Sequence, residues 1–81
     1  MKTIMGLKID KREEAAVKTQ ELLTEYGCIL KTRIGLHEAS NICSPVGTII
    51  LEFIENADEK IWELEKKLQV IEGVHVAKME L

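Results

Sequence analysis

The sequence is poor in the residues on which specialised scaffolds depend. Its 81 residues include two cysteines, one proline and three aromatic side chains. Cys28 and Cys43 are too few for a disulfide framework or a zinc knuckle, so we expect free thiols in a reducing compartment. No apolar run approaches the ~20 residues that cross a bilayer. Residues 1–6 lack the long apolar core and the cleavage site of an export signal, so we expect a cytoplasmic protein without a membrane partner.

A strong positive charge is also lacking. Lysine and arginine number 11 against 14 acidic residues, which leaves a net charge of −3 and a pI of ≈ 5.4. Sheets that bind RNA present aromatic side chains on the exposed face of their central strands. Here Tyr26 and Trp62 fall in predicted helices, and Phe53 falls on a predicted core face. We therefore expect no direct nucleic-acid partner.

The residues that are present suit one small folded domain. Hydrophobic residues make up 46% of the chain and charged residues 31%, which is an ordinary balance for a globular protein. The length leaves no room for a second core, and no segment has the composition of a linker. We expect a single domain over residues 1–81 whose two halves repeat the same order of elements.

The first half predicts a strand, a helix and a second strand. Thr3–Ile9 alternates with the period of a strand. Asp10, with Glu13 three residues later, forms a variant of the capping box that begins a helix. Gly27 is predicted to take the left-handed position that ends this helix, and residues 28–36 to form the second strand. The helical face between them is formed by Ala15, Thr19, Leu22 and Tyr26.

The second half repeats this order. Residues 47–55 are rich in β-branched side chains and predict a third strand. Asn56, with Glu59 three residues later, predicts a second helix cap. Gly73 is predicted to stop the helix, and residues 74–81 to form the last strand. The apolar residues of this second helix recur at helical spacing: Ile61, Leu64, Leu68 and Ile71.

Two such strand–helix–strand units in tandem predict an α+β, ferredoxin-like βαββαβ fold. Each half is too small to bury its own sheet face. Right-handed crossovers leave a gap between the two parallel strands of each half, and the first strand of the other half fills this gap. The predicted antiparallel sheet has the strand order 4-1-3-2, with both helices on one face.

The other face of this sheet is predicted to carry an apolar patch. Its expected members are Ile4, Ile29, Ile50, Ile54 and Val76, diluted by Lys8, Arg33, Glu52, Lys78 and Glu80. A contiguous exposed apolar patch is typical of an interface, and a small domain gains from additional burial. We expect a homo-oligomer, either a dimer or a tetramer. The sequence leaves open whether it forms by packing of sheet faces or by pairing of sheet edges.

Motifs for catalysis are missing from the sequence. There is no Ser/His/Asp set, no glycine-rich phosphate loop and no paired-carboxylate signature. Gly6 and Gly35 stand alone within predicted strands, where an isolated glycine indicates close approach of another group. Asp10, Glu13 and Glu14 occupy the start of the first helix and would repel an anion there. We therefore expect a non-enzymatic protein without a cofactor.

A small metal site is the alternative that the sequence leaves open. His37 and Cys43 flank the loop between the second and third predicted strands, and His75 opens the fourth. All three belong to the same end of the predicted sheet. The second and fourth strands are opposite edges, about 14 Å apart, so a shared metal would require the loop to fold across or a second subunit to contribute.

Four segments together resemble a known family. They are residues 22–30, 32–36, 47–55 and 68–74, and the resemblance extends over essentially the whole chain. The most specific part is residues 33–36, Arg-Ile-Gly-Leu, which is similar to a Gly-Arg-Met-Gly segment. The family is that of the iron-only hydrogenase system regulators, which are small ACT-like proteins. Their fold is similar to that of the C-terminal ligand-binding domain of the nickel-responsive repressor.

The resemblance implies a non-enzymatic regulatory domain that binds a small effector or a protein partner at an oligomer interface. The positions that it marks are Arg33, Gly35 and His37, with Asp10 at the same end of the sheet. The resemblance implies that the regulated process is the expression or maturation of an iron-only hydrogenase. Since no DNA-binding arm is expected, control of transcription would act through another protein.

The chain also departs from the family pattern. Thr32, Ile34 and His37 stand where the family commonly has glycine, methionine and proline. The Asp-x-Pro-Gly turn of ACT domains that bind amino acids is absent, because residues 11–13 follow Asp10. The nickel-binding histidines of the repressor are absent as well, so the resemblance does not imply nickel sensing.

Overall fold

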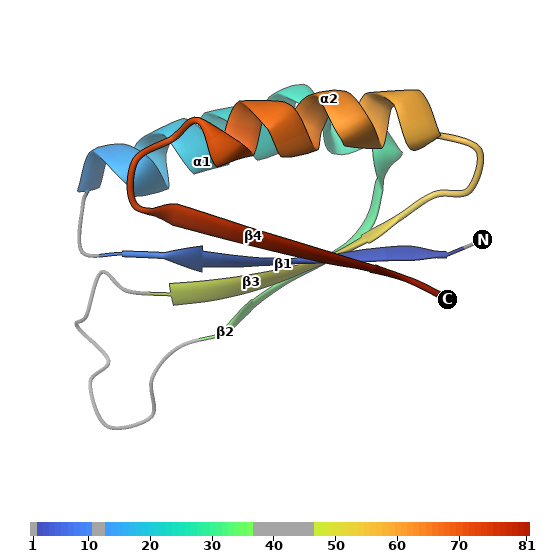
Figure 1. The fold of residues 1–81 in the computed structure, drawn as a ribbon, viewed down its shortest axis with the longest axis horizontal. Coiled ribbons are helices and arrows are strands. Elements are labelled where there is room, and N and C mark those ends of the chain that lie inside the picture. Colours follow the sequence, from blue (N-terminus) through green and yellow to red (C-terminus); the bar gives the residue numbers. More distant parts are fainter. Residues whose placement is uncertain (1, 11–12, 37–46) are drawn as a thin grey trace.

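The structure is a computed structural model of the chain and describes residues 2–10, 13–36 and 47–81 (Figure 1). The strands are β1 (Thr3–Ile9), β2 (Leu30–Leu36), β3 (Gly47–Phe53) and β4 (Val74–Glu80). The helices are α1 (Glu13–Glu25) and α2 (Asp58–Gln69), and a short 3-10 helix (Gly27–Ile29) precedes β2. None of the helices in these described ranges is long and apolar enough to cross a membrane.

The four strands form one antiparallel sheet in the order β2-β3-β1-β4. Read from the other edge this is the predicted order 4-1-3-2. Both helices cover the same face of the sheet, and the other face, which we call the open face, has no element over it among the described residues (Figure 1). The predicted ferredoxin-like βαββαβ fold is therefore confirmed.

The core lies between the sheet and the helices. Alternate residues of β1 and β3 point into it, as the strand period requires. The sheet contributes Met5, Leu7, Ile9, Ile49, Leu51 and Phe53, and α2 contributes Ile61, Leu64 and Leu68. Full burial of one such side chain contributes about 1.5–3 kcal/mol to folding. Because these side chains point into the core, the alternate residues of the same strands lie on the open face.

The ends of the helices differ from the prediction. Asn56 is not the cap of α2: Ala57 holds that position, without a side-chain cap, and Asn56 is left-handed with φ 63°. Gly27 does not take a left-handed conformation and instead begins the 3-10 helix. Gly73 does, with φ 91°, but α2 has already ended at Gln69, so this glycine forms the turn into β4. The predicted cap at Asp10 involves residues 11 and 12, which lie outside the described residues.

The predicted composition of the open face is also wrong at five positions, which are Ile29, Arg33, Val76, Lys78 and Glu80. Lys78 and Glu80 of β4 lie opposite the buried residues Met5 and Thr3 of β1 and therefore face the helices. Val76 lies opposite Leu7 of β1 and therefore faces the helices. Arg33 lies opposite buried Leu51, because a register shift between Leu30 and Thr32 turns the following residues of β2 over. Ile29 packs against the core from the 3-10 helix.

Candidate ligand-binding cleft

Arg33 and Gly35 lie together on the helix side of the edge strand β2. They stand opposite Leu51 and Ile49 of β3, so the pleat directs both toward α1. Every residue of β2 after Leu30 is exposed. These two positions, marked by the family resemblance, are therefore brought together by the fold.

A cleft of ≈ 240 Å³ separates β2 from α1 at this point. Its apolar lining comes from Ile9, Ala16 and Ile49, and its polar lining includes Gln20 and Arg33. Ala16 and Gln20 are four residues apart on α1, so they face the cleft from the same side of the helix. The sequence marked neither of them as a site residue, although this spacing was the available signal.

The guanidinium of Arg33 has no acidic partner among the described residues. Its Nη2 donates a hydrogen bond to Oε1 of Gln20, which is a neutral acceptor. A guanidinium carries five N–H donors in a planar fork and remains charged at any ordinary pH. Most of its donor capacity is therefore available for a carboxylate or phosphate in the cleft.

Gly35 contributes space to the cleft. Its φ lies outside the left-handed region, and a Cβ built on it would meet no atom within 4 Å. The backbone of β2 thus does not require glycine here, and a strand loses stability by having one. No described residue approaches Gly35 closely, so the close approach expected from the sequence remains a prediction about a ligand in the cleft.

Asp10 is not part of this cleft arrangement. Its Oδ2 lies 3.5 Å from Nε2 of His75 on β4, whereas Arg33 lies on the opposite edge strand. Its backbone N–H donates to the carbonyl of Gly73 at 2.8 Å, which ties the end of β1 to the turn before β4. His37, the fourth predicted site residue, lies outside the described residues.

The metal alternative receives no support from the part of the chain that the structure describes. No group of three His, Cys, Asp or Glu side chains gathers there to hold a metal ion. His75 is paired with Asp10, and Cys28 is an exposed free thiol. The other two proposed ligands, His37 and Cys43, lie outside the described residues.

Comparison with known proteins gives structural similarity only. No family model matches the chain, and no curated protein matches it. An uncharacterized protein from Thermotoga maritima superposes with a TM-score of 0.82 and 26% identity, over 99% of this chain and 95% of that one. The ACT domain of a GTP pyrophosphokinase from Chlorobium tepidum superposes with a TM-score of 0.70 and 16% identity, over 98% and 97% of the two chains. The chain has an ACT-like fold.

A third structure shows the same unit as part of a larger protein. A formyltetrahydrofolate deformylase from Pseudomonas putida matches 100% of this chain with a TM-score of 0.59 and 13% identity, and only 29% of its own length is covered. At these identities the ACT domain and the deformylase share the fold alone. The assignment of chemistry to the ACT-like fold of this chain therefore has to come from its own residues.

Proposed function

We propose that this chain is a regulatory domain that binds a small organic anion in the cleft between α1 and β2. The observation that carries the proposal is Arg33, which lies at the wall of a partly apolar cleft and has no acidic partner among the described residues. The fold shared with an ACT domain supports a binding role over a catalytic one. The proposal assigns no chemical step to any residue.

The ligand class follows from the cleft. Arg33 supplies a forked cationic donor that suits a carboxylate or a phosphate. Ile9, Ala16 and Ile49 supply an apolar surface for a short aliphatic group. A volume of ≈ 240 Å³ suits a small metabolite. An aliphatic carboxylate combines these properties.

We propose further that the regulated process is the expression or maturation of an iron-only hydrogenase. The support is the resemblance of residues 33–36 to the regulator family. Since the described residues are all used in one sheet and the helices on it, regulation would act through a partner protein. A sensor of this kind requires that the effector prefer one state of the protein over another.

The binding proposal is tested by NMR titration with isovalerate, an aliphatic carboxylate, and with isovaleramide, its uncharged counterpart. We expect the wild-type protein to bind isovalerate more tightly than isovaleramide. Arg33→Gln should weaken isovalerate binding at least about ten-fold, because a hydrogen bond to a charged group contributes about 1.5–3 kcal/mol.

Two further variants distinguish a site effect from a general one. Lys31→Gln removes the same charge from the same strand outside the cleft, and it should leave isovalerate binding unchanged. Gly35→Val should abolish binding while the protein stays folded, because the space above Gly35 is empty of neighbouring atoms in the described structure. Equal binding of acid and amide, or equal loss with Lys31→Gln and Arg33→Gln, would contradict the proposal.

A further inference from the structure

One row of residues crosses the open face through all four strands. Registration of the strands aligns Ile34 of β2 with Ile50 of β3, Ile50 with Gly6 of β1, and Gly6 with Ala77 of β4. We call these four residues the apolar row. Two large side chains occupy one half of the row, and glycine and alanine occupy the other half. The open face is therefore raised over β2 and β3 and hollowed over β1 and β4.

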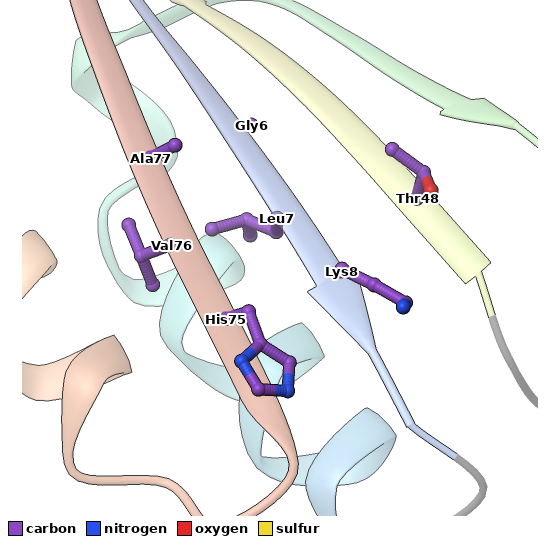
Figure 2. A pocket seen from close by; sticks show the side chains of 7 residues that line it. All are labelled: Gly6, Leu7, Lys8, Thr48, His75, Val76 and Ala77. Atoms are coloured by element: carbon purple, nitrogen blue, oxygen red, sulfur yellow. The ribbon is translucent and has the colours of Figure 1, made fainter.

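The hollow over β1 and β4 is shown in Figure 2. It measures ≈ 270 Å³, with Gly6 and Ala77 side by side within it. Lys8, Thr48 and His75 surround it toward one end of the strands. The ridge beside it is accessible, since Ile34 is 48% exposed although it is a large apolar residue.

The fold of a single chain does not explain the glycine in this row. The φ of Gly6 is outside the left-handed region, and an added Cβ would make an ordinary contact of 3.8 Å with Cδ1 of Ile50. Glycine inside a strand lowers stability by roughly 0.5–1 kcal/mol relative to alanine. A glycine inside a strand often marks a bulge, a bend or a site of close approach by another molecule, and the register of β1 shows neither a bulge nor a shift at Gly6.

A ridge and a hollow in the same row are complementary to each other. A two-fold axis parallel to the strands, passing between β1 and β3 in the plane of contact, places β2 of one copy over β4 of the other. The row then meets the same row of the second copy in the reverse order, as an isologous interface requires. We propose that two copies of this chain pack their open faces together, with Ile34 and Ile50 of each copy seated in the Gly6–Ala77 hollow of the other.

The size of the face is sufficient for a weak dimer. Four strands at ~4.8 Å spacing and seven residues at ~3.3 Å give a face of about 19 by 23 Å, or about 440 Å² in outline. Two such faces together bury about 900 Å², which is below the ~1,200–2,000 Å² of stable interfaces and within the range of weak, transient ones. The dimer should therefore dissociate on dilution in the micromolar range.

The charges around the row are compatible with this contact. The carboxylate of Glu52, in the neighbouring row, accepts a hydrogen bond from Thr32 at 3.0 Å and lies 2.9 Å from Nζ of Lys2. These two partners, Lys2 first, hold the pKa of Glu52 below its usual value. The charge is thus met within its own chain. Lys8 and His75 lie in the row on the other side of the apolar row, so polar groups stand on both sides of it along the strands.

The proposal is independent of the ligand cleft, because the cleft lies on the opposite side of the sheet. It is tested by crosslinking in a Cys28→Ser/Cys43→Ser background with a bismaleimide that has a two-carbon spacer. An equimolar mixture of the Ile34→Cys and Ala77→Cys variants should give the 34–77 crosslinked dimer. Ile34→Cys alone should not crosslink, since the proposed axis separates the two copies of β2 by about 14 Å sideways. Val17→Cys, exposed on α1, serves as the control and should not crosslink to Ile34→Cys.

Sedimentation equilibrium provides the second measurement. Ala77→Phe fills the hollow and should give a folded monomer, while Val17→Phe, exposed on α1, should sediment as the wild type does. Crosslinking of Ile34→Cys to itself as fast as to Ala77→Cys would overturn the proposed arrangement. A wild-type monomer at all concentrations would overturn it too, as would a small molecule retained in the hollow of that monomer.

Discussion

Thr19 lies in α1 with its hydroxyl group buried and without a hydrogen bond to any described residue. The side chain is fully buried, and Oγ1 has no hydrogen-bond partner among the described residues. A buried hydroxyl without a partner loses its hydration and regains nothing for it. The sequence placed Thr19 correctly on the buried face of the helix, but it did not show that this polar group would be left unpaired.

Thr19→Val should therefore stabilise the protein. Valine has nearly the same shape and no hydroxyl, so the free energy of unfolding should rise by about 1 kcal/mol. Urea denaturation followed by circular dichroism measures the change. Thr24→Val is the matched control, because Oγ1 of Thr24 donates to the carbonyl of Gln20 at 2.9 Å on the exposed side of the same helix. An equal gain in both variants would show that helix propensity, and not the buried hydroxyl, is responsible.

Arg33 and Gly35 show what could be predicted of the site at the level of single residues. The family-like segment marked both, and the isolated glycine indicated close approach. The face on which they lie was predicted wrongly for Arg33, because one additional residue between Leu30 and Thr32 reverses the alternation. A bulge of this kind leaves no pattern in a single sequence. Gln20 and Ala16 join the site only through packing of α1 against the sheet.

At the scale of elements, the periods of the sequence were sufficient to predict the four strands and both α-helices, but not the 3-10 helix Gly27–Ile29, where the sequence predicted the start of the second strand. Ambiguity remained where both faces of a strand carry apolar residues. In β4 the sequence analysis placed Val76 on the open face, whereas the structure has Val74 and Val76 facing the helices and Ala77 and Met79 on the open face. The pairs differ little in hydrophobicity, so only the register with β1 decides between them. The contribution of β4 to the open face is thus Ala77 and Met79, and not Val76.

The turn from β3 into α2 provides a test at this scale. Asn56 is the one residue other than glycine with a positive φ among those described, at 63°. Asn56→Ala should lower the free energy of unfolding by about 1 kcal/mol, since a Cβ without a polar side chain disfavours this conformation. Asn56→Gly should be neutral or stabilising, and guanidinium denaturation of the two variants gives the difference. Equal stabilities would show that the left-handed turn is not maintained in solution.

For the whole molecule, the sheet separates two surfaces of different character. The helix side offers a cleft with a cation that lacks an acidic partner among the described residues, and the open side offers an apolar ridge beside a hollow. The fold and the presence of an apolar patch were predictable, because both follow from periodicity. The ridge and the hollow of the open face were not predictable, because they depend on which residues of four different strands stand in one row.

We expect these two surfaces of the sheet to bind different partners. Methyl proton–carbon correlation spectra of one sample, recorded during dilution from millimolar to low micromolar concentration and then during addition of isovalerate, test this expectation most directly. We expect dilution to shift the methyl signals of Ile34, Ile50 and Ala77, and isovalerate to shift those of Ala16 and Ile49. Shifts of the same methyl groups in both experiments, or no response of the open-face methyl groups to dilution, would contradict the account.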